Sequence, residues 1–137
     1  MDNIVLGYDD SEASQRALER AAELVKALGS KLAVISVAPL AAGGARGGGG
    51  VDSIDSPAKH AAELQQARAY LEKEGITADY EEPIGDPAEA IIEMATRANA
   101  DLIVVGTREP STLARLFGQS VSDSITHKAR CDVLVVH

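Results

Sequence analysis

Short strand-like segments alternate with longer segments of helical periodicity, and this alternation constrains the fold of the chain more than any other feature. The strand-like segments are residues 4–8, 32–37, 77–82, 102–106 and 133–136, and the helical ones are residues 12–28, 58–74, 87–98 and 120–128. A strand, a helix and a second strand in this order form a right-handed crossover between parallel strands. We therefore expect an α/β fold of three layers, α/β/α, with a five-stranded parallel sheet and four helices.

Local signals indicate where several of these elements begin and end. Asp86-Pro87-Ala88-Glu89 combines an N-cap residue, a proline at the first helical position and a glutamate at N3. Gly29 and Gly75 are placed to end the two preceding helices. The segment 77–82 is more polar than the other strands, which predicts that it lies near an edge of the sheet.

A glycine-rich stretch lies within residues 38–57, where seven of the residues from Gly43 to Gly50 are Gly or Ala. Ordering so many glycines costs backbone entropy, so we expect a mobile surface loop. This loop is too short to separate two folded domains. A chain of 137 residues fits one domain, which we expect to span residues 1–137.

Charge and composition argue against several classes of partner. The net charge of −8 disfavours nucleic acid, since an acidic surface repels phosphate backbones. Cys131 is the single cysteine, and no ligand spacing joins the three histidines, so we expect a packed thiol and no metal site. No apolar run approaches a membrane span, and residues 1–3 do not resemble a secretory signal. We expect a cytoplasmic protein that does not bind membranes.

An open parallel sheet binds its ligands beyond the carboxyl ends of its strands. The most suggestive segment at that edge runs from Gly106 to Ser122, where a glycine closes a buried strand and Ser120-Val121-Ser122 opens a helix. The backbone N–H groups of a helix N-terminus favour an anion, and Arg108 or Arg115 is placed to clamp a phosphate. Gly106 as a simple strand terminator, with the serines as N-caps, explains the same residues, so the pattern alone leaves both readings open.

Four segments of the sequence together resemble the universal stress protein family. Residues 4–11 are similar to its first strand and following turn, and residues 102–108 to its fourth strand and the start of its nucleotide loop. Residues 120–122 and 129–136 are similar to its closing helix and last strand. The resemblance covers the whole chain and implies the strand order 3-2-1-4-5 and a homodimer formed through the last strand. In one branch of the family it also implies an adenine nucleotide, ATP or AMP, with or without Mg.

The resemblance also implies which residues contact that nucleotide. It places Asp9 near the ribose or its metal, with Gly7 and Tyr8 beside it, and the backbone of Val37 at the adenine. The phosphate side would comprise Gly106, Thr107, Arg108, Gly118, Gln119, Ser120, Val121 and Ser122. Asp9 has a second reading as a residue that caps the turn between a strand and a helix.

The phosphate loop departs from the pattern G-x2-G-x9-G-[ST] of the ATP-binding branch. Gly106 and Ser120 match its first and last positions, but the second and third glycines fall on Glu109 and Gln119. Glu109 brings a negative charge toward the phosphates and Pro110 removes an N–H donor, whereas Gly118 lies one place early. We therefore expect weakened triphosphate binding, with a shorter phosphate tail less affected.

These observations lead to three hypotheses about function. The first is a stress-response module that binds an adenine nucleotide. The second is a protein of the same fold whose altered loop does not bind ATP and which acts through dimerisation and partner contacts. The third is a weak ATPase; the sequence has no Walker loop, no G-x-G-x-x-G after the first strand and no serine nucleophile elbow, so we expect no enzyme.

Overall fold

The computed structural model describes residues 1–9, 11–37, 57–107 and 121–137, and its elements alternate as the sequence predicts. In chain order they are β1 (Asn3–Gly7), α1 (Glu12–Leu28), β2 (Lys31–Ile35), α2 (Pro57–Lys73), β3 (Ala78–Glu81), α3 (Pro87–Arg97), β4 (Leu102–Gly106), α5 (Val121–Lys128) and β5 (Asp132–Val136). Within the described residues this gives five strands and four helices, the number of each that the sequence predicts.

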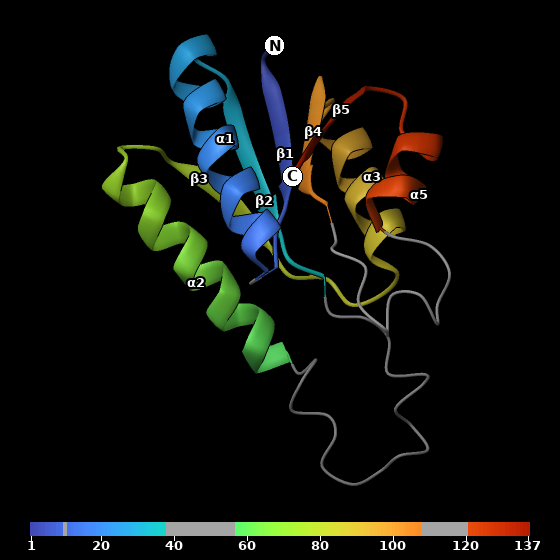
Figure 1. Ribbon diagram of the computed structural model, residues 1–137, viewed down its shortest axis with the longest axis horizontal. Helices are drawn as coiled ribbons and strands as arrows, with labels where there is room; N and C mark the ends of the chain where they lie inside the picture. The colour runs from blue at the N-terminus through green and yellow to red at the C-terminus, as the bar shows by residue number, and fades with distance from the viewer. Residues whose placement is uncertain (10, 38–56, 108–120) are drawn as a thin grey trace, which may run out of the picture.

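The five strands form one parallel sheet in the order β3-β2-β1-β4-β5 (Figure 1). This order confirms the expected fold, with β1 in the centre and β3 and β5 at the two edges. The chain runs outward from β1 to β3, then returns to the other side of β1 for β4 and β5. The strand order therefore reverses between β1 and β4, which is where open α/β sheets bind ligands.

Helices cover both faces of the sheet, α1 and α2 on one face and α3 and α5 on the other (Figure 1). The first face buries Leu6 and Val34 against Leu18 of α1 and Leu71 of α2. The second face buries apolar residues of all the inner strands against α3 and α5: Val5, Ile35, Val37, Ile103, Val105, Ile91, Met94 and Ile125. Both faces consist mainly of aliphatic side chains, which explains why the inner strands are continuous apolar runs in the sequence.

The predicted capping residues act as expected. The Asp86 carboxylate accepts a hydrogen bond from Glu89 N at 2.9 Å, and Pro87 occupies the first turn of α3. Gly29 follows α1 with φ of +70°, a left-handed conformation that glycine adopts without steric cost. These caps explain why the bounds of α1 and α3 follow closely from the sequence.

The first two strands end earlier than the sequence predicts, at Gly7 and Ile35 rather than at Tyr8 and Val37. The ladder continues for one bond beyond each of them, from Tyr8 N to Ile35 O at 2.9 Å and from Ser36 N to Glu81 O at 3.0 Å. Helix α2 begins at Pro57, one residue before the prediction. Apart from Pro57, the glycine-rich loop expected over residues 38–57 lies outside the described residues.

Candidate functional site

The carboxyl ends of β1, β2 and β4 lie side by side at one edge of the sheet. Gly7 pairs with Ile35, and Leu6 pairs with both Val34 and Val104. The residues that leave these strands are therefore neighbours in space although they are far apart in the sequence. This edge, at the reversal of strand order, is the candidate site.

Asp9 lies in the turn from β1 into α1 and is half-buried. One oxygen of its carboxylate, Oδ1, accepts a hydrogen bond from Ser11 N at 2.8 Å, and its own N–H donates to Ser14 Oγ at 3.1 Å. The turn-capping reading of Asp9 is therefore correct. It leaves room for the ligand reading as well, because a carboxylate has about four acceptor positions on its two oxygens.

Gly7 and Tyr8 are buried beside this turn and serve the packing of the sheet. A Cβ built on Gly7 would lie 2.8 Å from Ile91 Cδ1 of α3 and 3.1 Å from Val105 Cγ1 of β4. Tyr8 is 4% exposed, belongs to the core under α1 and α2, and accepts a hydrogen bond from Gln15 Nε2 at 2.7 Å. The aromatic ring of Tyr8 thus packs against the core beneath α1.

Val37 follows β2 and packs its side chain into the core under α3 and α5. Its neighbour Ser36 is fully buried and donates from Oγ to Glu63 Oε2 of α2 at 3.0 Å. Glu63 is only 3% exposed, so a carboxylate lies inside the protein next to the exit of β2. This pair could not be predicted, because nothing in the local sequence pattern connects a serine after a strand with a glutamate on a later helix.

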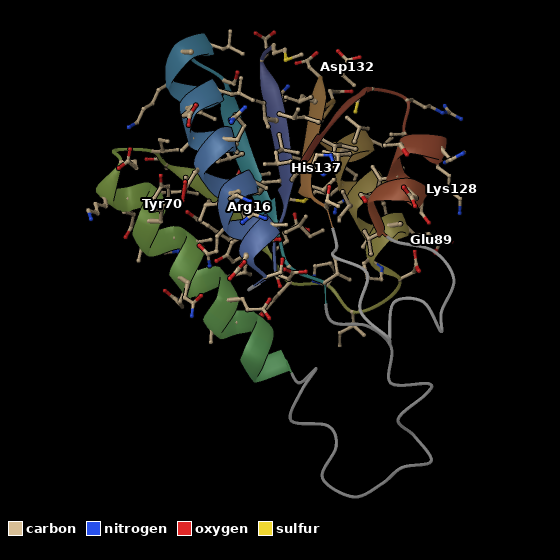
Figure 2. The ribbon with its side chains drawn as sticks, in the orientation of Figure 1. Arg16, Tyr70, Glu89, Lys128, Asp132 and His137 are labelled. Carbon is tan, nitrogen blue, oxygen red and sulfur yellow. The ribbon has the colours of Figure 1, made fainter. Side chains whose placement is uncertain are left out.

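Thr107 follows β4 and is held by the end of β5. Its N–H donates to Val136 O at 2.8 Å, and its Oγ1 lies 3.2 Å from His137 Nδ1. The Arg16 side chain of α1 also reaches this end of β5, where its Nε donates to His137 O at 2.7 Å; both residues are labelled in Figure 2. The sequence analysis placed Thr107 in the candidate site but missed Arg16 and His137, which no motif singles out.

The helix that follows the expected phosphate loop starts at Val121, at the same edge of the sheet as Thr107 (Figure 1). Val121 is half-buried against the core under α3 and α5, and Ser122 is 6% exposed in the first turn. The remaining residues predicted for the phosphate side lie outside the described residues: Arg108, Gly118, Gln119 and Ser120. Glu109 and Pro110 lie outside them too, so their effect on phosphate binding stays a prediction.

Cys131 precedes β5 and is half-buried. Burial raises the pKa of its thiol, and the neighbouring Asp132 carboxylate raises it further. A raised pKa keeps the thiol protonated at neutral pH, which agrees with the packed thiol expected from the sequence.

Among the residues that the structure describes, no three His, Cys, Asp or Glu side chains are grouped so that they could hold a metal ion. None of the helices in this part of the chain is both long enough and apolar enough to span a membrane.

Comparison with known proteins relates this arrangement to one family. The model of the universal stress protein family matches residues 1–137. The stress response protein NhaX of Bacillus subtilis is 30% identical over 161 aligned positions, which cover 98% of this chain and 97% of that protein.

Two solved structures share the fold and more than a quarter of the sequence. A universal stress protein in complex with cAMP is 31% identical over 99% of this chain and 96% of its own, with a TM-score of 0.72. The universal stress protein of Archaeoglobus fulgidus in complex with dAMP is 26% identical over 100% of this chain and 98% of its own, with a TM-score of 0.67. The match of the family model over the entire sequence, together with the strand order and these relatives, shows that the chain belongs to the universal stress protein family.

Proposed function

We propose that this protein is a stress-response module that binds an adenine nucleotide with a single phosphate at the carboxyl edge of its sheet. One observation carries the proposal. The turn that holds Asp9 and the exit of β4 at Gly106 and Thr107 meet where the strand order reverses, next to the exit of β2 at Val37. Acceptors for ribose hydroxyls and donors for a phosphate would thus come from opposite sides of one crevice.

The described residues provide groups suited to the nucleoside part of such a ligand. The Asp9 carboxylate is half-buried, and its Oδ1 accepts from Ser11 N. A carboxylate has about four acceptor positions, so it can accept a further hydrogen bond from a ribose hydroxyl. Thr107 offers a hydroxyl at the start of the segment that would face the phosphate. If Mg accompanies the nucleotide, Asp9 is the residue that would hold it, and the ion would supply positive charge to the phosphate oxygens.

The preference for one phosphate over three rests on the sequence and on the relatives. Glu109 and Gln119 replace two glycines of the ATP-binding pattern, and Pro110 lacks an N–H donor. Two similar universal stress proteins, 31% and 26% identical to this chain, are in complex with cAMP and dAMP, both of which carry a single phosphate. We therefore propose that the affinity for ATP is lower than the affinity for an adenine nucleotide with one phosphate.

Isothermal titration of the full chain with AMP, cAMP, ATP and GMP tests the proposal. We expect AMP or cAMP to bind more tightly than ATP. GMP should bind least, because its base differs at the position that we propose the backbone of Val37 contacts. If none of the adenine nucleotides releases or absorbs heat, and equilibrium dialysis also finds no binding, the proposal is wrong. Mass spectrometry of the freshly purified protein provides an independent check for a retained nucleotide.

We propose further that the protein forms a homodimer through β5. This strand lies at an edge of the sheet, and four of its residues are apolar and only half-buried: Val133, Leu134, Val135 and Val136. An apolar edge strand with unpaired backbone groups favours pairing with another strand. The opposite edge differs, because β3 carries Asp79 and Glu81, which oppose such pairing. The alternative is a dimer that binds no nucleotide and acts through protein partners. Absence of nucleotide binding in the titration would favour this alternative.

We also propose that the protein binds its nucleotide without turnover and acts in the cytoplasm. No catalytic residue was assigned from the sequence, and a slow ATPase activity is the competing hypothesis. Incubation with ATP and Mg, followed by measurement of ADP, tests this hypothesis. ADP production by the protein that is faster than in a buffer control, and that no variant of Asp9 exceeds, would favour the ATPase.

A further inference from the structure

The turn between β1 and α1 closes on itself through three hydrogen bonds. Ser11 N donates to Asp9 Oδ1 at 2.8 Å, Ser14 N donates to Ser11 Oγ at 3.1 Å, and Asp9 N donates to Ser14 Oγ at 3.1 Å. Each residue therefore donates to one member of the turn and accepts from another. Ser14 completes the cycle, because its hydroxyl is the acceptor that holds the backbone of Asp9.

Ser14 has little freedom to move within this turn. It is 5% exposed, and its backbone nitrogen lies 2.7 Å from the point that a Cβ on Gly106 would occupy. The first turn of α1 is therefore in direct contact with the exit of β4. Ser14 stands between Asp9 on one side and Gly106 on the other, and both of them belong to the candidate site.

We propose that Ser14 is a positioning residue, which fixes Asp9 in the orientation that accepts a ribose hydroxyl of the bound nucleotide. The inference rests on the proposed function and deepens it. A carboxylate held in place before the ligand arrives loses less conformational entropy on binding, so its hydrogen bond contributes more to affinity. Without the Ser14 hydroxyl, Asp9 N loses this acceptor, so the backbone that carries the carboxylate is held less firmly in the turn.

Because Ser14 is proposed to act through Asp9, the loss of nucleotide affinity on replacing Ser14 should depend on the ribose hydroxyls of the ligand. The test uses two probes, AMP and 2′,3′-dideoxyadenosine monophosphate, which differ only in the ribose hydroxyls. Isothermal titration of Ser14→Ala should show AMP affinity reduced about three- to tenfold, the range for loss of one hydrogen bond. The affinity for the dideoxy compound should stay within about twofold of the wild-type value, which is within the scatter of such comparisons.

A double-mutant cycle shows whether Ser14 acts through Asp9. In an Asp9→Ala background, Ser14→Ala should cause no further loss of AMP affinity, because the group that it positions is gone. The matched control is Ser30→Ala at the other end of α1. Ser30 is also a nearly buried serine, and its Oγ donates to Met1 O at 2.6 Å at the opposite edge of the sheet. Its removal should leave the affinities for both probes unchanged.

Each outcome decides the inference. Equal losses for both probes, additive losses in the cycle, or unchanged AMP affinity in Ser14→Ala would overturn it. If Ser14→Ala does not fold, Ser14→Cys keeps a side chain of similar size but replaces the hydroxyl with a weaker acceptor, and it should show the same hydroxyl-dependent loss. Absence of AMP binding by the wild-type protein would overturn both proposals, whereas normal wild-type binding with an unaffected variant would overturn this one alone.

Discussion

Gly106 lies directly against Ala13, so that a Cβ built on this glycine would sit 2.5 Å from the carbonyl carbon of Ala13 and 2.6 Å from its oxygen. No side chain fits at such distances, and backbone cannot move aside as the end of a side chain can. The missing Cβ thus allows α1 to dock onto the exit of β4. From the sequence, Gly106 was predicted to contact phosphate or to end a strand; it is the last residue of β4, and the structure adds this packing contact, while the phosphate role stays a prediction.

The first prediction is that Gly106→Ala destabilises the fold. The added methyl group must push α1 away from β4, which we expect to cost about 1–3 kcal/mol or more, as overpacking does elsewhere. Urea unfolding followed by circular dichroism measures the loss. Because this cost does not depend on a ligand, reduced nucleotide binding by the variant would not by itself show that Gly106 contacts phosphate.

Gly7→Ala is the matched control, at the end of the neighbouring strand. There the nearest atom to an added Cβ is Ile91 Cδ1, the tip of a flexible side chain, at 2.8 Å. Ile91 can rotate or shift, so the cost should be clearly smaller than at Gly106. A larger loss of stability for Gly7→Ala than for Gly106→Ala would contradict the account of the docking contact.

The alternation of elements and their caps could be predicted from the sequence because both are local properties. The Asp86 cap and the Gly29 stop involve residues within one helical turn of each other, and the structure confirms both. The polar composition of β3 likewise predicted its place at an edge. The strand order itself came from the family resemblance, since alternation alone is compatible with several orders.

Much of the candidate site could not be predicted because its contacts join distant parts of the chain. Glu63 meets Ser36 across 27 positions, and Arg16 meets His137 across 121. Such pairs become neighbours only after the sheet has brought their elements together. The turn at Asp9 lies between these extremes: its capping role was visible in the sequence, whereas the part played by Ser14 requires the coordinates.

The second prediction is that the proposed dimer dissociates when a charged side chain is introduced into β5. Val135→Glu places a carboxylate in the middle of the half-buried edge strand. Burying that charge against a second copy is costly, so we expect the dimer dissociation constant to rise by about 100-fold or more. Size-exclusion chromatography with light scattering over a range of concentrations measures the change.

Leu28→Glu is the control for this experiment. Leu28 is 49% exposed at the end of α1, so the same charge is added to an apolar surface position away from β5. This variant should keep the wild-type dissociation constant, and circular dichroism should show that both variants remain folded. A wild-type protein that is monomeric at all accessible concentrations would refute the proposed dimer.

The third prediction is that restoring the missing glycines raises the affinity for ATP. Glu109→Gly removes a negative charge and Gln119→Gly allows a closer approach of backbone N–H groups to phosphate. We expect the double variant to bind ATP at least about tenfold more tightly, corresponding to about 1.4 kcal/mol. AMP affinity should change less, since its single phosphate depends less on the second and third glycines; an unchanged ATP affinity would refute the loop argument.

The fourth prediction concerns acid stability and Asp101, at the opposite end of the sheet from the candidate site. Its Oδ2 accepts hydrogen bonds from Asp2 N at 2.7 Å and Asn3 N at 3.0 Å, and the bonds from Asn3 and Asp2 hold the pKa of the carboxyl below its ordinary value. The Asp101 carboxylate therefore binds a proton more readily in the unfolded chain than in the folded one. The stability from this carboxylate is present above the unfolded pKa of about 3.9 and is lost as the pH falls through the lower folded pKa.

Asp101→Asn should accordingly be less stable than the wild type at pH 7, and the difference should shrink as the pH falls below about 4. Urea unfolding at pH 7, 5, 4 and 3 measures it, and a difference that stays constant over this range would contradict the prediction.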